Sequence, residues 1–387
     1  MRKHLFPLFL LLIGVNASAQ QDFFALVGKE TPSIVFNDFR AIDPAKGISG
    51  EQIFTADSSV KVFSQSRNGS VTEDKNTYNN AQAVNMATLA YDSYNNLVYM
   101  PMFSSNIYVL NAKSREITLI ENDVARVTAC DINSHFTRMT TGYDGSIYAI
   151  NNAGTQFLKI SRKGNQYTVN DLGIVTDDAS NGKNSFTIME TGFGGDMIAD
   201  AEGNFYVFSA SGNVFKVTAK ELKAKFIGKI SGIPDNYSVN GSAVNSKGNI
   251  VIASAKGAAL YEVDLNTLQA KQLPGEQNLH IYDLASKYFA NDKATSGSVF
   301  ANIDIYPTRV DEKLINISVN DKAVKGNITL NVFDLSGKNV LKQNVSVKDG
   351  SLRQQVYLKN LIGGAYLVNI TDESGKVLLS KKILVTE

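Results

Sequence analysis

The chain has 387 residues, and 38 Lys and Arg against 37 Asp and Glu give it a formal net charge of +1. Loss of Arg2 and Lys3 with a leader would bring the net charge to −1, which argues against nucleic acid as a partner because phosphates need a basic face. The single cysteine, Cys130, excludes an internal disulfide, and we expect it to lie buried in a strand over Val127–Ile132. Only two histidines follow the leader, too few for a zinc site, so we expect no metal and no cofactor.

The first 19 residues have the pattern of a secretory signal peptide. Met1-Arg-Lys-His4 is basic, Leu5–Val15 is apolar with two interruptions, and Ala17-Ser-Ala19 supplies the small residues that signal peptidase requires. The apolar run has 11 residues, too few to span a hydrocarbon core about 30 Å thick. We expect cleavage before Gln20, export of the rest, and no transmembrane segment in the mature chain. An uncleaved membrane anchor is the alternative.

Residues 20–84 show the weakest pattern. Phe23–Val27, Ser33–Phe39 and Val60–Ser64 fit strands, whereas Asp57–Asn80 is rich in Ser, Asn, Thr and Lys and is typical of an exposed loop. We expect these strands to join a larger sheet elsewhere in the chain.

From Ala83 onward, a four-strand pattern repeats. The clearest copy runs from Asp196 to Thr218, where Gly203-Asn204 and Gly212-Asn213 mark tight turns between three strands. Second strands begin, at intervals of 50, 58 and 45 residues, at Leu97, Ile147, Phe205 and Ile250. Third strands follow at Ile107, Phe157, Val214 and Leu260, and fourth strands fit Ile117–Ile120, Tyr167–Val169, Ala224–Ile230 and Ala270–Leu273.

A four-stranded unit that recurs every 40–50 residues or so is typical of a β-propeller blade. One small sheet cannot bury both of its faces alone, whereas radial stacking covers every face and ring closure protects the edges. At about 50 residues per blade, we predict about six four-stranded blades over residues 20–300, with five or seven also possible. Residues 20–83 and 280–300 fit a ring closed by pairing the N-terminal strands with the last blade. A β-sandwich is the alternative.

The repeat aligns five residues at one position of the innermost strands, at the mouth of the central channel where propellers commonly bind ligands. They are Thr88, Arg138, Asp196 and Gly241, with Asp283 added by a looser alignment. Arg138 between carboxylates could bind a polar ligand through bidentate hydrogen bonds. The interpretation we favour is a structural ion-pair ring that satisfies the polar groups of the channel.

Two further patterns are interpreted as turns. The turns at Asp144 and Asp200 supply one or two carboxylates each, whereas calcium takes about six to eight oxygens. Gly192-Phe-Gly-Gly195 lies between strands and does not open a helix, so we do not expect a phosphate-binding loop there.

The last part of the chain, residues 301–387, follows a polar linker over 291–298 and has a different pattern. Alternating apolar residues and Ser-Gly turns predict a small Greek-key-like β-sandwich. Its strands are expected at Leu314–Val319, Ile328–Asp334, Lys338–Val345, Leu352–Leu358, Ala365–Thr371 and Val377–Leu384.

Five short motifs occur in this sandwich in a fixed order. They are Tyr306-Pro307, Val332-Phe-Asp-Leu-Ser-Gly337, Leu361-Ile-Gly-Gly364-Ala-Tyr366-Leu-Val368, Gly375-Lys376 and Lys381-Lys382-Ile-Leu-Val385. This order resembles the C-terminal sorting domain of the type IX secretion system, although Thr308 departs from the usual Asn or Pro. The resemblance implies recognition by the outer-membrane translocon, and a tail that can be removed on export. An adhesive or carbohydrate-binding sandwich is the alternative.

The propeller repeats carry a second resemblance. The runs Thr137–Ile150 and Gly194–Val207 are similar to uncharacterised secreted propeller proteins of the Bacteroidetes, and the likeness extends over Thr137–Pro274. It implies a location outside the cell or on the outer-membrane surface, but no particular activity.

Two classes of function remain open. The first is a non-catalytic surface or extracellular propeller that binds a glycan, peptide or protein. The second is a hydrolase or lyase acting on an extracellular polysaccharide, with Asp or Glu at the channel mouth. The absence of Trp and the scarcity of His weaken the second class. A pair of carboxylates within ~10 Å of each other at the channel mouth would favour it.

Overall fold

Strands make up nearly all the regular structure in the computed structural model. The structure describes residues 23–29, 35–44, 48–55, 60–73, 86–92, 94–102, 104–128, 130–275, 280–291, 303–310, 313–321, 323–348 and 350–386. The expected signal peptide lies outside these ranges. Within these ranges, the helical elements are short: α1 (Met189–Gly192) and two 3-10 turns (Ile132–Ser134 and Ala179–Asn181). Within the described residues, no helix has the length and apolar character needed to cross a membrane.

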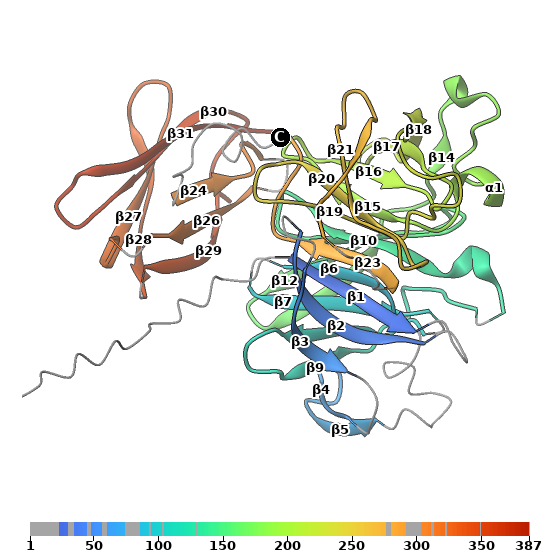
Figure 1. Cartoon of the computed structure of the whole chain (residues 1–387). Coiled ribbons are helices and arrows are strands. Elements are labelled where there is room, and N and C mark those ends of the chain that lie inside the picture. Colours follow the sequence, from blue (N-terminus) through green and yellow to red (C-terminus); the bar gives the residue numbers. More distant parts are fainter. Residues whose placement is uncertain are drawn as a thin grey trace, which may run out of the picture.

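Five sheets form the blades of a β-propeller (Figure 1). Blade 1 contains β6 (Met86–Tyr91), β7 (Asn96–Pro101), β8 (Ile107–Asn111) and β9 (Ile117–Ile120). Blade 2 contains β10 (Phe136–Thr141), β11 (Ile147–Asn151), β12 (Phe157–Lys163) and β13 (Gln166–Asp171). Blade 3 contains β15 (Asp196–Ala199), β16 (Asn204–Phe208), β17 (Asn213–Thr218) and β18 (Lys223–Lys229), with β14 (Thr176–Asp177) at its edge. Blade 4 contains β19 (Gly241–Val244), β20 (Ile250–Ala253), β21 (Tyr261–Val263) and β22 (Ala270–Gln272).

The fifth blade closes the ring with strands from both ends of the propeller. Its order is β23 (His280–Ser286), β1 (Phe23–Lys29), β2 (Val35–Asp43) and β3 (Ile48–Thr55). The innermost strands β6, β10, β15, β19 and β23 contact one another in that order, and β23 contacts β6 again. The predicted ring closure is therefore confirmed, and it leaves no blade with an uncovered face.

The predicted class, an all-β propeller followed by a β-sandwich, is confirmed, but the estimate of about six blades is one too high. The difference lies in residues 60–73, which form the hairpin β4 (Val60–Ser64) and β5 (Gly69–Glu73). Strand β4 pairs in parallel with β9, so the hairpin widens blade 1 to six strands and does not begin a blade of its own. The exposed loop expected over Asp57–Asn80 is therefore wrong for residues 60–73, and the rest of that range lies outside the described residues.

Each blade is buried on both faces because its side chains alternate between two neighbours. In β7, Leu97 and Tyr99 belong to the core shared with blade 5, whereas Val98 and Met100 belong to the core shared with blade 2. Five such cores fill the five interfaces between blades. Alternate residues of a strand point to opposite faces of its sheet, and here both sets are apolar. Such strands are buried on both faces, as radial stacking of the blades requires.

The predicted turns between the first and second strands of a blade have one common geometry. Asp200 Oδ1 accepts hydrogen bonds from Glu202 N at 2.9 Å and Asn204 N at 2.8 Å. Asp92 and Asn245 do the same in their own turns. Asp144 Oδ1 accepts from Ser146 N at 3.0 Å. These side chains are occupied by local donors, as Asx turns require.

The expectation for Cys130 is wrong. The residue is exposed and lies just before the 3-10 turn at Ile132–Ser134, outside any strand. Asp131 caps that turn by accepting from Asn133 N, so local side-chain hydrogen bonds replace the strand pairing suggested by the apolar residues.

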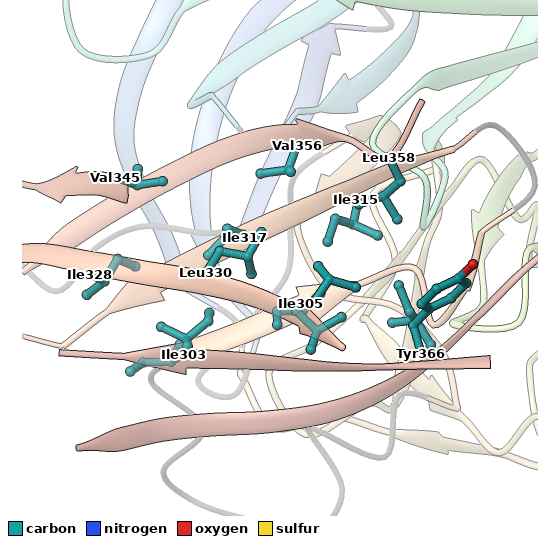
Figure 2. Packing of buried hydrophobic residues seen from close by; sticks show 14 of the residues in the cluster. Ile303, Ile305, Ile315, Ile317, Ile328, Leu330, Val345, Val356, Leu358 and Tyr366 are labelled. Carbon is teal, nitrogen blue, oxygen red and sulfur yellow. The ribbon is translucent and has the colours of Figure 1, made fainter. Parts of the chain in front are cut away.

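The C-terminal sandwich has two sheets around its own apolar core (Figure 2). The three-stranded sheet contains β24 (Ile303–Tyr306), β26 (Leu314–Asn320) and β29 (Ser351–Tyr357). The five-stranded sheet contains β25 (Arg309–Val310), β31 (Val377–Val385), β30 (Gly364–Thr371), β27 (Gly326–Phe333) and β28 (Asn339–Val347). The core draws on both sheets, and none of its residues comes from the propeller.

Candidate functional site

The structure places the five aligned residues at equivalent positions of the inner strands, one in each blade. Four of them pair with the residue three places after the start of the predicted second strand: Thr88 with Met100, Arg138 with Ile150, Asp196 with Phe208 and Gly241 with Ala253. Asp283 pairs with Leu26 of β1, because the N-terminal strand takes that place in blade 5. The looser alignment of Asp283 therefore identified the equivalent residue.

Asp196 and Asp283 meet in the centre of the ring as a buried carboxyl pair. Both side chains are 0% exposed, and the two carboxyl groups share a hydrogen bond. Two carboxylates in direct contact cannot both ionise in a dry site, so they hold one proton between them. Burial raises the pKa of Asp196 to about 7, and burial together with the neighbouring Asp196 raises that of Asp283 well above its usual range.

The pair also satisfies backbone donors of the neighbouring blades. Asp196 Oδ2 accepts from Ser242 N of blade 4 at 2.6 Å, and Asp283 Oδ2 accepts from Leu89 N of blade 1 at 2.8 Å. In both cases, the carboxylate accepts a hydrogen bond from the backbone N–H of the residue just after the aligned position in the next blade. Inner strands diverge around the channel and cannot pair with each other, so these buried N–H groups need side-chain partners. The carboxyl pair therefore links blades 3, 4, 5 and 1.

Arg138 is the member of the set that comes from blade 2, and its positive charge compensates the negative charge of the carboxyl pair. Its side chain is 0% exposed, and its guanidinium donates to the carbonyls of Gly194 at 3.1 Å, Asn151 at 3.4 Å and Gly192. It also lies 4.8 Å from the ring centroid of Phe186. The Gly192–Gly195 loop therefore directs carbonyl oxygens at a cation, which is opposite to a phosphate-binding loop and agrees with its interpretation as a turn.

The three ionisable groups balance one another electrostatically. Burial lowers the pKa of Arg138 to about 9, with attraction to Asp196 acting in the opposite direction, so the guanidinium stays charged at neutral pH. One proton on the carboxyl pair leaves a single negative charge beside this single positive charge. A neutral cluster is the least costly way to bury ionisable groups.

The channel itself offers little room. Next to the cluster, a hollow of about 10 Å³, room for about one water molecule, is lined by Met139, Ile198, Leu284 and Tyr288, among others. Small-molecule sites usually occupy roughly 300–1,000 Å³. Beyond the hollow, the segment after β23 leaves blade 5 and pairs with blade 3, where Ala201 N donates to Ala290 O at 3.0 Å and Ala290 N donates to Ala199 O at 3.0 Å. The chain therefore crosses this end of the channel.

The remaining members of the set are small. Thr88 Oγ1 accepts from Met100 N at 3.1 Å, and Gly241 is buried. A Cβ added at Gly241 would lie 2.8 Å from Leu284 N of the next blade, so only glycine fits at this position. The five residues thus form a packed, hydrogen-bonded cluster. It can share a proton, but its groups are closed to a substrate.

The residues of the predicted sorting motif occupy the sandwich. Tyr306 ends β24 before Pro307, Gly337 and Gly375 take positive φ of 82° and 83° in hairpin turns, and Gly364 begins β30. Tyr366 is buried and donates from its hydroxyl to Ile362 O at 2.9 Å. Lys381 Nζ lies 2.6 Å from Asp304 Oδ1, whereas Lys376 and Lys382 are exposed.

Several contributors to these two regions escaped the sequence analysis. The backbone donors Leu89 and Ser242 carry no side-chain signal, and neither do the carbonyls of Gly192 and Gly194 that hold Arg138. The crossing segment around Ala290 looks like the start of a linker in sequence. The run Tyr288-Phe-Ala290 was its only apolar signal.

One known protein family matches the C-terminal part of the chain. Residues 304–386 match the family described as the secretion system C-terminal sorting domain, which indicates export to the cell surface or the extracellular space. No curated protein gives a significant match.

Solved structures that are similar to this chain include an extracellular domain, a Bacteroides caccae protein and a lyase. The extracellular domain of the one-component system BT4673 from B. thetaiotaomicron is 12% identical, with a TM-score of 0.35, over 95% of this chain and 57% of that chain. A Bacteroides caccae protein is 11% identical, with a TM-score of 0.38, over 69% and 100%. Virginiamycin B lyase from Staphylococcus aureus is 9% identical, with a TM-score of 0.33, over 95% and 96%. This chain thus spans little more than half of the BT4673 domain.

Substitution Arg138→Ala should destabilise the propeller by about 3–5 kcal/mol, because it leaves buried carbonyls without a donor and the carboxyl pair without its counter-charge. Urea unfolding at pH 7 measures this loss. Arg126→Ala is the matched control, since that arginine is 68% exposed in its ion pair with Asp171 and should cost at most about 1 kcal/mol. Unchanged stability of Arg138→Ala would contradict a structural role.

The carboxyl pair predicts an unusual pH dependence. A carboxyl group whose pKa is higher in the folded state than in the unfolded state stabilises the folded state at low pH. That contribution is lost as the pH rises toward the pKa of the folded state. Stability should therefore fall between pH 4 and pH 8, by up to about 1.4 kcal/mol per pH unit for each proton involved.

Asp283→Asn tests the same point directly. The amide can accept from Leu89 N and donate to Asp196, as the protonated acid does, without a proton to lose. We expect a higher melting temperature than the native chain at pH 8, little difference at pH 5, and a flatter pH profile. A lower melting temperature at pH 8 would show that the pair is not held protonated.

Proposed function

We propose that this chain is exported by the type IX secretion system and acts outside the cell, or on the outer-membrane surface, as a non-catalytic binding propeller. The match of residues 304–386 to a sorting domain supports the export route. The signal peptide expected at residues 1–19 would take the chain across the inner membrane first. The proposed partners are the translocon, through the sandwich, and an extracellular glycan, peptide or protein, through the propeller.

The sealed channel is the observation that carries the non-catalytic assignment. Asp196 and Asp283 are close enough to form the acid–base pair that an enzyme would need. However, their carboxyl groups are in direct contact and 0% exposed. Glycoside hydrolases hold their two carboxyl groups about 5–9.5 Å apart so that a sugar or water fits between them. The direct contact between Asp196 and Asp283 leaves no such space, and one oxygen of each carboxyl group accepts from the amide of Ser242 or Leu89. The ligand surface would therefore lie on the outside of the propeller.

Removal of the sorting domain tests the export route. In a host with a type IX secretion system, the chain truncated after residue 300 should accumulate in the periplasm, whereas the full chain should reach the surface or the medium. Fractionation and immunoblotting with an antibody against the propeller measure the distribution. Lys382→Ala is a suitable single-residue comparison, because this exposed motif lysine contributes nothing to the sandwich core. Surface delivery of the truncated chain would contradict the proposal.

The binding assignment is tested with the purified mature chain on glycan arrays, in pull-downs from the extracellular fraction, and in polysaccharide-degradation assays. We expect binding without turnover, and no effect of Asp283→Asn on that binding. Polysaccharide cleavage that Asp283→Asn abolishes would establish the alternative, an enzyme of the hydrolase or lyase class.

A further inference from the structure

The sandwich contacts the propeller through one end of its three-stranded sheet. Tyr306 of β24 lies with its ring centroid 5.4 Å from that of Tyr143 and 6.4 Å from that of Phe289, and the two propeller rings lie 4.9 Å apart. Tyr143 follows β10 of blade 2, whereas Phe289 belongs to the segment that crosses the channel. Three rings from three separate parts of the chain thus form one cluster between the domains.

A polar contact accompanies the rings. Asn316 Nδ2 donates to Asp144 O of the propeller at 3.2 Å, and also to Tyr306 O at 3.3 Å. In the sheet, Asn316 pairs directly with Tyr306, so both side chains lie on the same outer face of the sandwich. Their neighbours Ile305, Ile315 and Ile317 point the other way, into the sandwich core (Figure 2).

Asn316 shows that this face is covered. An asparagine on the outer face of a sheet is normally exposed, yet this one is only 3% exposed. The propeller turn fits against it closely, because Gly145 has a φ of 80° and a Cβ added there would lie 3.2 Å from the Asn316 amide. A glycine at positive φ is thus matched to one side chain of the other domain.

The propeller side of the contact is held in place independently of the sandwich. Asp144 accepts from Ser146 N at 3.0 Å and Tyr148 Oη at 2.9 Å, and its carboxylate lies 3.1 Å from Lys159 Nζ. Next to Phe289, Ala290 is anchored to blade 3 by two backbone hydrogen bonds. A preformed surface loses little freedom on binding, and a tethered partner is present at an effective concentration in the millimolar range or so.

We propose that the propeller carries a docking site for its own sorting domain. The site consists of the Tyr143–Gly145 turn and Phe289, and its occupant is the Tyr306–Asn316 face of the three-stranded sheet. Docking holds the sorting domain in one orientation while the chain is intact. The five-stranded sheet then remains uncovered, with Leu367 43% and Leu384 48% exposed on the side away from the core. The site serves orientation within the chain and is independent of the ligand that the propeller binds.

Distance measurements in the intact mature chain test this site. Nitroxide labels on Lys271→Cys of the propeller and Lys382→Cys of the sandwich, in a Cys130→Ser background, report the interdomain distance by double electron–electron resonance. Lys271 and Lys382 are both exposed and lie outside the contact between the domains. We expect one narrow distance distribution. The double variant Tyr306→Ser with Asn316→Ala should at least double its width.

Two comparisons keep the test decisive. Tyr357→Ser removes an aromatic ring that is 42% exposed on the same three-stranded sheet, and should leave the distribution narrow. If the double variant unfolds the sandwich, Phe289→Ser replaces it, because that residue lies outside the sandwich core. A broad distribution in the native chain, or an unchanged one in variants that remain folded, would overturn the proposal.

Discussion

The pairing of β1 with β23 is the constraint on which the rest of this structure depends. A blade of this size has two apolar faces and too few residues to cover either, so each blade is stable only between two neighbours. In an open row, two faces would remain exposed to water. By joining residues 23–29 to residues 280–286, the chain removes both exposed faces at once. The same closure brings Asp283 of blade 5 next to Leu89 of blade 1, so the polar centre of the ring exists only when the ring is closed.

The apolar interfaces bury the faces of the blades, whereas the polar centre provides hydrogen-bond partners for the backbone of the inner strands. Apolar residues fill the spaces between blades, but near the axis the inner strands separate and leave N–H groups that no strand can satisfy. A carboxyl pair with one shared proton accepts from these N–H groups, and an arginine donates to nearby carbonyl oxygens, so the cluster as a whole is neutral. In the function that we propose, ligand binding lies on the outer surfaces of the propeller and export depends on the appended sandwich. In this respect, the channel of this propeller acts as a core.

The sequence predicted more of the architecture than of the site. Alternation and the turn residues before each second strand indicate the strands of blades 1 to 4, because these are local signals within one stretch of sequence. The left-over ends indicate ring closure. The hairpin at residues 60–73 was missed as part of blade 1, since its parallel pairing with β9 joins segments far apart in sequence. Alignment of the repeats found Arg138, Asp196 and Asp283, yet their burial and shared proton follow from the ring diameter, which no single repeat encodes. The partners of Tyr306 and Asn316 are likewise a property of two domains together.

The central claim is that the channel is a closed structural core, and amide hydrogen exchange of the native chain tests it most directly. Leu89 and Ser242 donate their N–H groups to the carboxyl pair at the axis of the ring. If the channel is sealed, both amides should exchange only through global unfolding, as slowly as the amides of β7 and β20, with the same dependence on denaturant. Fast exchange of Leu89 and Ser242 under native conditions, while β7 and β20 remain protected, would contradict this account and show an open, solvent-filled site.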